Sequence, residues 1–297
     1  MALRDFAVLI FICLVWAFNN IVSKIVVAHW GVPPLFYASV RFALVAACTL
    51  PWLWPRPRPT WRIVLVALLM GAGNFALLFI GFKTASPSAA SIVIQLGVPI
   101  TTVLSMFMLG EKVRWRRGLG MALTLAGAVI VMWHPGGMGI SAGLWFVAAA
   151  ALAGSLGAVM MKQMEGIKPL QFQAWVGFSS LWPLAALSFL TEHDQLPLAL
   201  AAGWPFFGAV VFSALIVSVI GHTLYYGLIQ KYEATLISPL TLMTPLATIG
   251  MGVAITHDHF DGRMAIGAAL ALLGVLIIAL RPNRMMPLLM AIRNRSQ

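Results

Sequence analysis

The stretch SAASIVIQLGVPITTVLSMFMLGE, residues 88–111, and its echo ATLISPLTLMTPLATIGMGVAITH, residues 234–257, decide the fold. Each has about twenty apolar residues, which is enough for an α-helix to cross a bilayer. Each also carries proline in its interior, Pro99 in the first stretch and Pro239 and Pro245 in the second. A proline inside a helix removes a backbone hydrogen bond and bends the helix. Membrane helices tolerate single prolines, but two aligned ones favour a functional hinge in each stretch.

The composition is that of an integral membrane protein. The chain has 297 residues, of which 61% are hydrophobic and 9% are charged, and its mean hydropathy is +0.94. The formal net charge of +11 does not indicate a nucleic-acid partner, because the basic residues lie in short turns between apolar runs. Cys13 and Cys48 both lie inside apolar runs, so no disulfide framework is indicated.

Runs of spanning length follow one another along the whole chain, which predicts an all-α membrane protein with ten transmembrane helices. The runs are Phe6–Ala28, Pro34–Trp54, Ile63–Phe82, Ser88–Leu109, Leu119–Trp133, Ala142–Met161, Leu170–Leu190, Trp204–Ile229, Ala234–Ile255 and Ala265–Leu280. The first run lacks a convincing small-residue cleavage site, so we expect it to be a retained helix rather than a signal peptide.

The basic residues predict the orientation. Fifteen of the 19 Lys and Arg residues fall in segments on one side of the predicted spans. They are Arg4, Arg56, Arg58, Arg62, Lys112, Arg114, Arg116, Arg117, Lys162, Lys168, Lys231, Arg281, Arg284, Arg293 and Arg295. Cytoplasmic segments carry the excess of positive charge. We therefore predict a multi-pass protein of a bacterial-type inner membrane, with both termini cytoplasmic and residues 282–297 as a basic tail.

The two halves of the chain, residues 1–135 and 139–281, repeat each other. WAFNNIVSK at residues 16–24 lines up with GSLGAVMMK at residues 154–162, and Pro99 lines up with Pro245. Each half holds an odd number of predicted spans, so the second copy must enter the membrane from the opposite face. The sequence therefore predicts an inverted-topology repeat of two five-helix units.

A WxxNxxxxK-like stretch from Trp16 to Lys24, the pair Arg41–Phe42, the proline-bent fourth run that ends in Gly110–Glu111, and a glycine-rich fifth run resemble the EamA family of the drug/metabolite transporter (DMT) superfamily. The resemblance covers residues 6–281 and implies a ten-helix exporter that works by alternating access at a central cavity. Within the family the chain looks most like YddG-type amino-acid exporters. It departs from the pattern in its second half, where Val176 stands in place of Arg41 and His257–Asp258 in place of Gly110–Glu111.

Arg41 is the sharpest candidate for substrate binding. A charged side chain inside an apolar helix normally faces the bundle or a wet cavity and has a partner there. Arg41 could therefore hold a substrate carboxylate, or its side chain could snorkel to the outer interface. Lys24 and Lys162 lie nearer to helix ends, and we expect both to snorkel.

Two amides, several aromatic side chains and three further residues also belong to the predicted site. Asn20 and Gln95 could bind substrate or join helices to one another, and Gln95 lies four residues before Pro99, next to a carbonyl without a donor. Aromatic rings suit an aromatic or apolar substrate, although ordinary helix packing explains most of them. The remaining predicted site residues are Trp16, Phe79, Trp175, Tyr225, Ser238, Thr241 and Met243.

His222 is the only histidine well inside a predicted span, and we include it in the site. It could carry a coupling proton or simply be hydrogen-bonded. No predicted span has Asp or Glu in its middle, which weakens a carboxylate proton relay and makes facilitated export plausible.

Catalytic, metal and cofactor sites are not predicted. His257, Asp258, His259 and Asp261 form a cluster, but neighbours in one loop favour solvation over metal binding. The chain has no HExxH, GxSxG or P-loop motif, so we expect a non-enzyme that uses a gradient rather than ATP.

We therefore expect an exporter of small organic solutes, with aromatic and apolar amino acids favoured. Its partners would be a small-molecule substrate and membrane lipid. Efflux of lipophilic drugs or quaternary cations is the main alternative. Phosphorylated metabolites would need several buried basic residues, and a non-transporting membrane protein would need a catalytic cluster or soluble appendages. The coupling ion, the direction of flux and the choice between monomer and homodimer stay open.

Overall fold

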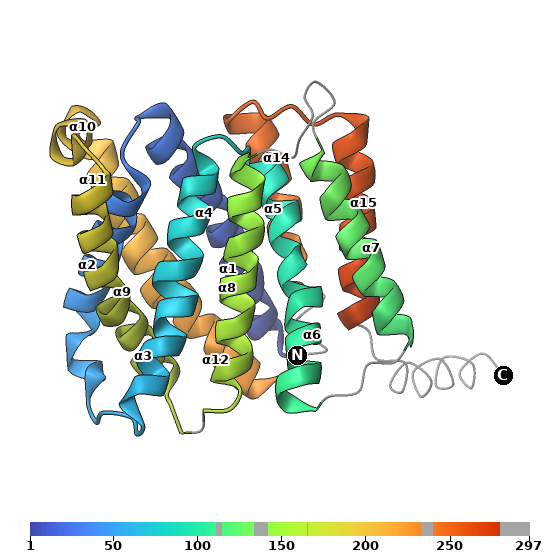
Figure 1. Cartoon of the computed structure of the whole chain (residues 1–297), viewed down its shortest axis with the longest axis horizontal. Coiled ribbons are helices and arrows are strands. Elements are labelled where there is room, and N and C mark those ends of the chain that lie inside the picture. The colour runs from blue at the N-terminus through green and yellow to red at the C-terminus, as the bar shows by residue number, and fades with distance from the viewer. Residues whose placement is uncertain (111–114, 134–141, 165, 233–239, 280–297) are drawn as a thin grey trace.

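The computed structural model describes residues 1–110, 115–133, 142–164, 166–232 and 240–279, and the regular elements within them are all helical (Figure 1). Eight helical segments in these ranges are long and apolar enough to cross a membrane, and two shorter apolar helices, Met243–Ile255 and Gly262–Ile278, follow them. The expected all-helical membrane protein is confirmed. The ninth predicted span begins within residues 233–239, outside the described residues, so the count of ten stays a prediction.

The helices of the first half follow the predicted runs but contain interruptions. They are α1 (Leu3–Lys24), which continues as a π-helical turn at Ile25–His29; α2 (Pro34–Thr49), which ends in a 3₁₀ turn at Leu50–Leu53; α3 (Thr60–Leu68) and α4 (Asn74–Phe82), joined by a π-helical turn at Leu69–Gly73; α5 (Pro87–Val93) and α6 (Gly97–Leu109), joined by a 3₁₀ turn at Ile94–Leu96; and α7 (Trp115–Met132).

The second half holds a short helix that the sequence did not predict, α10. Its helices are α8 (Ala142–Met161); α9 (Pro169–Thr191); α10 (Gln195–Ala201); α11 (Trp204–Val211) and α12 (Thr223–Lys231), joined by a long π-helical segment at Phe212–His222; α14 (Met243–Ile255); and α15 (Gly262–Ala279).

The two aligned prolines lie in the first turns of their helices rather than in mid-helix. Pro99 is the third residue of α6, and Pro245 is the third residue of α14. A proline in the first turn costs no intrahelical hydrogen bond, because the N–H groups there have no helical acceptor. The break in the fourth span therefore precedes Pro99, at Ile94–Leu96. Pro239 lies outside the described residues.

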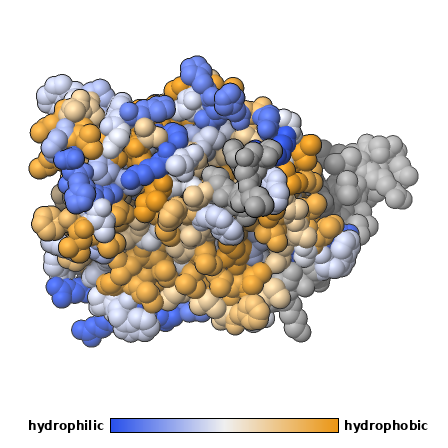
Figure 2. Space-filling model, turned by 45° about the horizontal axis from the view of Figure 1, so that its top comes forward, coloured by the Kyte–Doolittle hydropathy of each residue, from blue (hydrophilic) through white to orange (hydrophobic). Residues whose placement is uncertain are grey.

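The helices stand side by side in a bundle. α7 packs on α15 at one edge, α2 packs on α9 toward the other, and α1 packs on α14 between them (Figure 1). Apolar side chains cover a broad band of the visible surface, with hydrophilic residues above and below it (Figure 2). Such a band is what a lipid-facing surface requires.

Hydrogen bonds identify which helix ends lie together. Gln171 at the start of α9 donates to the carbonyl of Pro55 beyond α2 (2.7 Å), and Arg62 in α3 donates to Gln163 beyond α8 (2.9 Å). Lys231 at the end of α12 pairs with Asp5 in α1 (2.6 Å). These contacts gather the basic turns among the described residues at the lower end of the bundle in Figure 1.

At the opposite end of the bundle, side chains from one part of the chain form hydrogen bonds with the terminus of another helix. Glu192 accepts hydrogen bonds from the backbone N–H groups of Leu35 (2.9 Å) and Phe36 (2.8 Å) at the start of α2. Asp258 accepts from the N–H (2.9 Å) and the hydroxyl (2.5 Å) of Ser88 at the start of α5. Lys24, expected to snorkel, is half-buried and donates to the Phe82 carbonyl at the end of α4 (3.0 Å). Its ammonium therefore provides a hydrogen-bond donor for a backbone carbonyl at the end of α4, which has no partner within the helix.

The contact between α7 and α15 depends on glycine. A Cβ on Gly127 would overlap the carbonyl oxygen of Gly267 and would stand 2.5 Å from the Ala271 nitrogen. A Cβ on Gly118, in the same helix, would meet nothing within 4 Å. Small residues let two backbones approach closely, which is how membrane helices gain packing without a hydrophobic driving force.

We expect Gly127→Ala to destabilise the protein by about 1–3 kcal/mol, because the added methyl group overpacks the α7–α15 contact. Gly118→Ala is the matched control and should be neutral or slightly stabilising, since alanine favours a helix over glycine. Thermal unfolding of the two purified variants in detergent measures the difference. Equal unfolding temperatures would show that the close approach is not needed.

Candidate functional site

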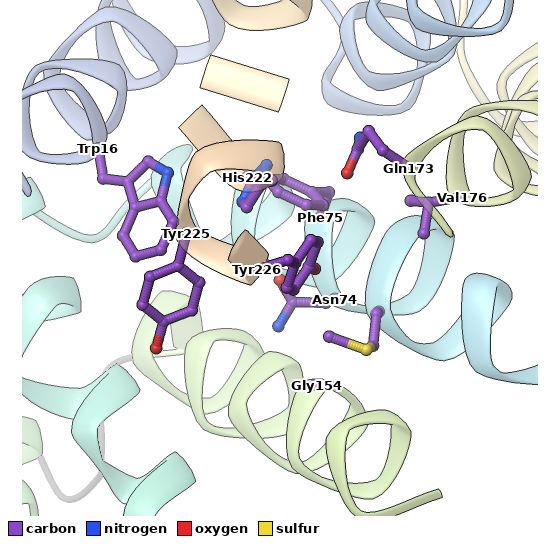
Figure 3. A pocket seen from close by; sticks show the side chains of 10 residues that line it. Trp16, Asn74, Phe75, Gly154, Gln173, Val176, His222, Tyr225 and Tyr226 are labelled. Carbon is purple, nitrogen blue, oxygen red and sulfur yellow. The ribbon is translucent and has the colours of Figure 1, made fainter. Parts of the chain in front are cut away.

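A cavity lies among five spans near the middle of the bundle (Figure 3). It contains about 660 Å³ of space free of protein atoms, counted out to its open side. The cavity is lined by Trp16, Met70, Asn74, Phe75, Gly154, Gln173, Val176, His222, Tyr225 and Tyr226.

One wall is built around the π-helical turn at Leu69–Gly73. The hydroxyl of Ser180 in α9 accepts a hydrogen bond from the Ala72 N–H (2.9 Å) and donates to the Ala67 carbonyl (3.4 Å). Gly71 faces this serine, and a side chain there would collide with it. The serine thus supplies hydrogen-bond partners to backbone groups of the widened turn. Met70, within the turn, and Asn74, directly after it, line the cavity.

Four aromatic rings and the His222 imidazole form half of the lining. The Trp16 ring centroid lies 4.8 Å from that of Tyr225 and 5.3 Å from that of His222. His222 also lies 6.2 Å from the Phe75 ring and stacks on Tyr226 at 6.3 Å. Figure 3 shows His222 between Trp16 and Phe75. A flat ligand could stack among these rings.

Two polar side chains in the lining have nitrogen atoms that make no hydrogen bond within the described residues. Trp16 Nε1 and His222 Nδ1 are buried and have no hydrogen-bond partner within the described residues. Asn74 donates to the Ala150 carbonyl (2.7 Å), which fixes one end of its amide. Gln173 reaches the cavity from α9 (Figure 3). The lining residues include no Asp, Glu, Lys or Arg, so recognition at the wall must use neutral groups.

Arg41 lies behind this lining and is completely buried, with 0% exposure. Its Nε and Nη2 donate to the Ser218 hydroxyl at 3.1 and 2.9 Å, and its Nη1 has no partner among the described residues. The guanidinium carbon lies 4.3 Å from the Phe75 ring centroid, so Phe75 contacts both Arg41 and the cavity. The snorkelling alternative is therefore wrong, because packing against aromatic rings holds the side chain inside.

The π-helical segment at Phe212–His222 presents three polar residues toward this region. The Ser213 hydroxyl donates to Asn19 Oδ1 (2.9 Å) and lies 2.5 Å from the Tyr37 hydroxyl. The Ser218 hydroxyl donates to the Ser213 carbonyl (3.1 Å). Residues four and five apart share a side of a π-helix, which explains how Ser213, Ser218 and His222 face inward together.

The structure brings three of the predicted site residues, Trp16, His222 and Tyr225, into the lining. Asn20 instead donates to Thr248 on α14 (3.3 Å), and Phe79 is fully buried against Tyr37, with ring centroids 5.0 Å apart. The other predicted residues outside the lining are Gln95 in the 3₁₀ turn, Trp175 in α9, Thr241 before α14 and Met243 in α14. Ser238 lies outside the described residues.

Sequence reasoning missed several lining residues. Asn74 and Tyr226 had a usable signal, an amide on an apolar helix and a second tyrosine beside Tyr225. Gln173 had the same amide signal as Asn74. Phe75 had no comparable signal, because a phenylalanine suits any side of an apolar span. The place of Phe75 and Gln173 in the lining depends on how α4 and α9 pack.

Comparison with known proteins gives a consistent result. The model of the EamA-like transporter family matches residues 6–133 and 140–280. The chain is 25% identical over 289 residues to a "Probable amino-acid metabolite efflux pump" of Salmonella typhimurium, which covers 93% of this chain and 95% of that protein. A protein of the same name from Escherichia coli is 23% identical over 291 residues, with coverage of 93% and 95%.

A solved structure titled "Crystal structure of protein" shares the fold. It has a TM-score of 0.66 and 20% sequence identity, and the match covers 93% of this chain and 96% of that chain.

We expect Ser218→Ala to destabilise the protein by about 2–3 kcal/mol, because it removes the hydroxyl that accepts two hydrogen bonds from the buried guanidinium. Ser179→Ala is the control, since the Ser179 hydroxyl is buried without a partner among the described residues. Thermal unfolding in detergent gives the comparison. A Ser218 variant as stable as the Ser179 variant would mean that Arg41 does not depend on this contact.

Proposed function

Because the chain belongs to the EamA-like transporter family, it is a membrane transporter rather than an enzyme, and we propose that it exports aromatic and apolar amino acids through the cavity of Figure 3. The observation that carries the proposal is the lining itself. Four aromatic rings and an imidazole line the cavity, and two buried nitrogen atoms, Trp16 Nε1 and His222 Nδ1, have no hydrogen-bond partner within the described residues.

The substrate is proposed to lie with its side chain among Trp16, Tyr225 and Tyr226. Its carboxylate would face the His222 and Phe75 wall, on the side where Arg41 lies. The names of the Salmonella and Escherichia relatives, both probable amino-acid metabolite efflux pumps, favour this class of solute. Asn20, the alternative carboxylate ligand, would first have to leave Thr248.

Efflux of quaternary cations is the competing function. It is less consistent with the site, because a cation inside a membrane protein normally pairs with an acidic side chain. The lining has no carboxylate, and its Phe75 ring already contacts the Arg41 guanidinium.

We propose that the protein consists of two inverted five-helix repeats and works by alternating access. The family model matches the chain twice, at residues 6–133 and 140–280. Two further correspondences support the repeat. Pro99 and Pro245 are both third residues of their helices, and the third span of each half has a π-helical segment, Leu69–Gly73 and Phe212–His222. The halves would rock about the cavity, bending at the breaks before Pro99 and Pro245, with Pro239 as a further hinge.

The proposed orientation places both termini in the cytoplasm and the protein in a bacterial-type inner membrane. The turns that hold Arg58 and Lys168 would face the cytoplasm, and the turn that holds Lys83 would face outward. The positive-inside rule supports this choice.

Counterflow in proteoliposomes tests the substrate. Vesicles loaded with unlabelled tryptophan should accumulate labelled aromatic amino acids in a saturable manner. Trp16→Ala should lower this uptake roughly tenfold, because it removes a stacking surface from the cavity. Trp182→Ala is the control, since Trp182 is 61% exposed on α9, away from the lining. Counterflow of a quaternary cation, with none of any amino acid, would overturn the substrate proposal.

Cysteine labelling tests the topology. In a background with Cys13 and Cys48 replaced by serine, Lys83→Cys should react with an impermeant maleimide in intact cells. Arg58→Cys and Lys168→Cys should react only after lysis, because two inverted five-span repeats place these two exposed turns on the same side. Labelling of Arg58→Cys and Lys168→Cys from opposite sides would be incompatible with the repeat.

A further inference from the structure

We propose that Arg41 is a charge filter, which makes the cavity electrically positive through the Phe75 ring and so excludes cations while admitting zwitterions and anions. The inference rests on the proposed function in taking the cavity as the transport site. It goes beyond that function because it assigns charge selectivity to one residue outside the lining.

The first step is that the charge on Arg41 is permanent. A guanidinium group does not lose its proton in proteins. Burial at 0% exposure removes the water that would otherwise screen it. Its polar partner is the neutral hydroxyl of Ser218, and Nη1 has no partner among the described residues. The positive charge is therefore incompletely satisfied by the groups around it.

The second step is that the five described carboxylates lie away from Arg41. Asp194 is exposed, and Asp261 accepts a hydrogen bond from the Met264 N–H at the start of α15. Asp5 pairs with Lys231 at one end of the bundle. Glu192 and Asp258 accept hydrogen bonds from the starts of α2 and α5 at the other end. Within the described residues no ion pair involves Arg41. The field of the guanidinium is therefore not cancelled locally.

The third step is the path from Arg41 to the cavity. The Phe75 ring lies 4.3 Å from the guanidinium carbon and also forms part of the lining. Phe42 and Phe79 flank the guanidinium, each with its ring centroid 5.8 Å away. Rings separate the charge from a bound solute but provide no counter-charge. A unit charge about 10 Å away, at an effective dielectric constant near 20, changes the occupancy of a monovalent ion by roughly tenfold.

Two variants separate a charge filter from a direct ligand. Arg41→Lys keeps the positive charge but loses the planar fork that binds a carboxylate bidentately. Arg41→Gln keeps hydrogen-bonding capacity but loses the charge. A filter predicts that the lysine variant retains selectivity and the glutamine variant loses it.

The test measures the potential without any transported substrate. Met70 lines the cavity and is partly exposed, so Met70→Cys, with Cys13 and Cys48 replaced by serine, provides a reporter thiol. Its rates of modification by an anionic and a cationic methanethiosulfonate reagent are measured in uncharged detergent. The same pair of reagents on Lys83→Cys, in an exposed turn, gives the reference ratio.

With Arg41 present, the anionic-to-cationic rate ratio at position 70 should exceed the reference ratio by about tenfold. Arg41→Gln should abolish this excess, and Arg41→Lys should keep it within about threefold. If Arg41→Gln does not fold, Arg41→Lys still tests the retained charge, and the absence of an excess in the protein that carries Arg41 still overturns the filter. A ratio no higher than the reference, or one unchanged by Arg41→Gln, overturns the filter.

Counterflow of three indoles extends the test to transport. Tryptophan is a zwitterion, indole-3-propionate an anion and tryptamine a cation. Arg41→Gln should raise tryptamine uptake relative to tryptophan at least tenfold, and an unchanged relative uptake would overturn the filter. Failure of the unmodified protein to counterflow any amino acid would overturn the proposed function, whereas the thiol ratio would still decide the filter.

Discussion

Inside a bilayer, backbone N–H and C=O groups have no water to bond, so each break in a helix must be satisfied by another part of the protein. The structure meets this constraint with side chains from neighbouring spans. Ser180 fills the widened turn at Leu69–Gly73, and Ser155 donates to the Gly97 carbonyl at the start of α6 (2.9 Å). Glu192 caps α2 in the same way. The breaks and ends of helices are therefore also points at which one span is hydrogen-bonded to another.

Arg41 must also find partners within the protein, because its side-chain charge is buried away from water. An unpaired guanidinium in hydrocarbon would be expensive, and here a serine hydroxyl and the Phe75 ring reduce that cost without neutralising the charge. The serine reaches Arg41 because a π-helical segment carries it, so the geometry of one span sets the electrostatics of another. A retained positive charge beside a neutral aromatic cavity accords with a solute that carries a carboxylate.

The first helix connects the cavity to both ends of the molecule. Trp16 lies in the cavity wall, while Asp5 near the start of α1 bonds to Lys231 and Tyr232, and Lys24 at its end bonds to the Phe82 carbonyl. Any rocking of α1 about its middle would displace both of these end contacts. The contacts at its two ends differ in kind, since one is an ion pair near the basic turns and the other a bond to a helix terminus.

The sequence by itself determined the class of protein and most of its spans. Residues 142–161, for example, were predicted as a helix with the bounds that α8 has, because length and apolarity are local properties. It also indicated Trp16, His222 and Tyr225, each a polar or aromatic exception on an apolar helix. Only the tertiary structure decided that Phe75 lines the cavity, that Arg41 stands behind it, and that residues 212–222 form a π-helix. A membrane helix that is apolar on all sides has no periodic signal for its inner face, and a widened turn depends on partners that other spans supply.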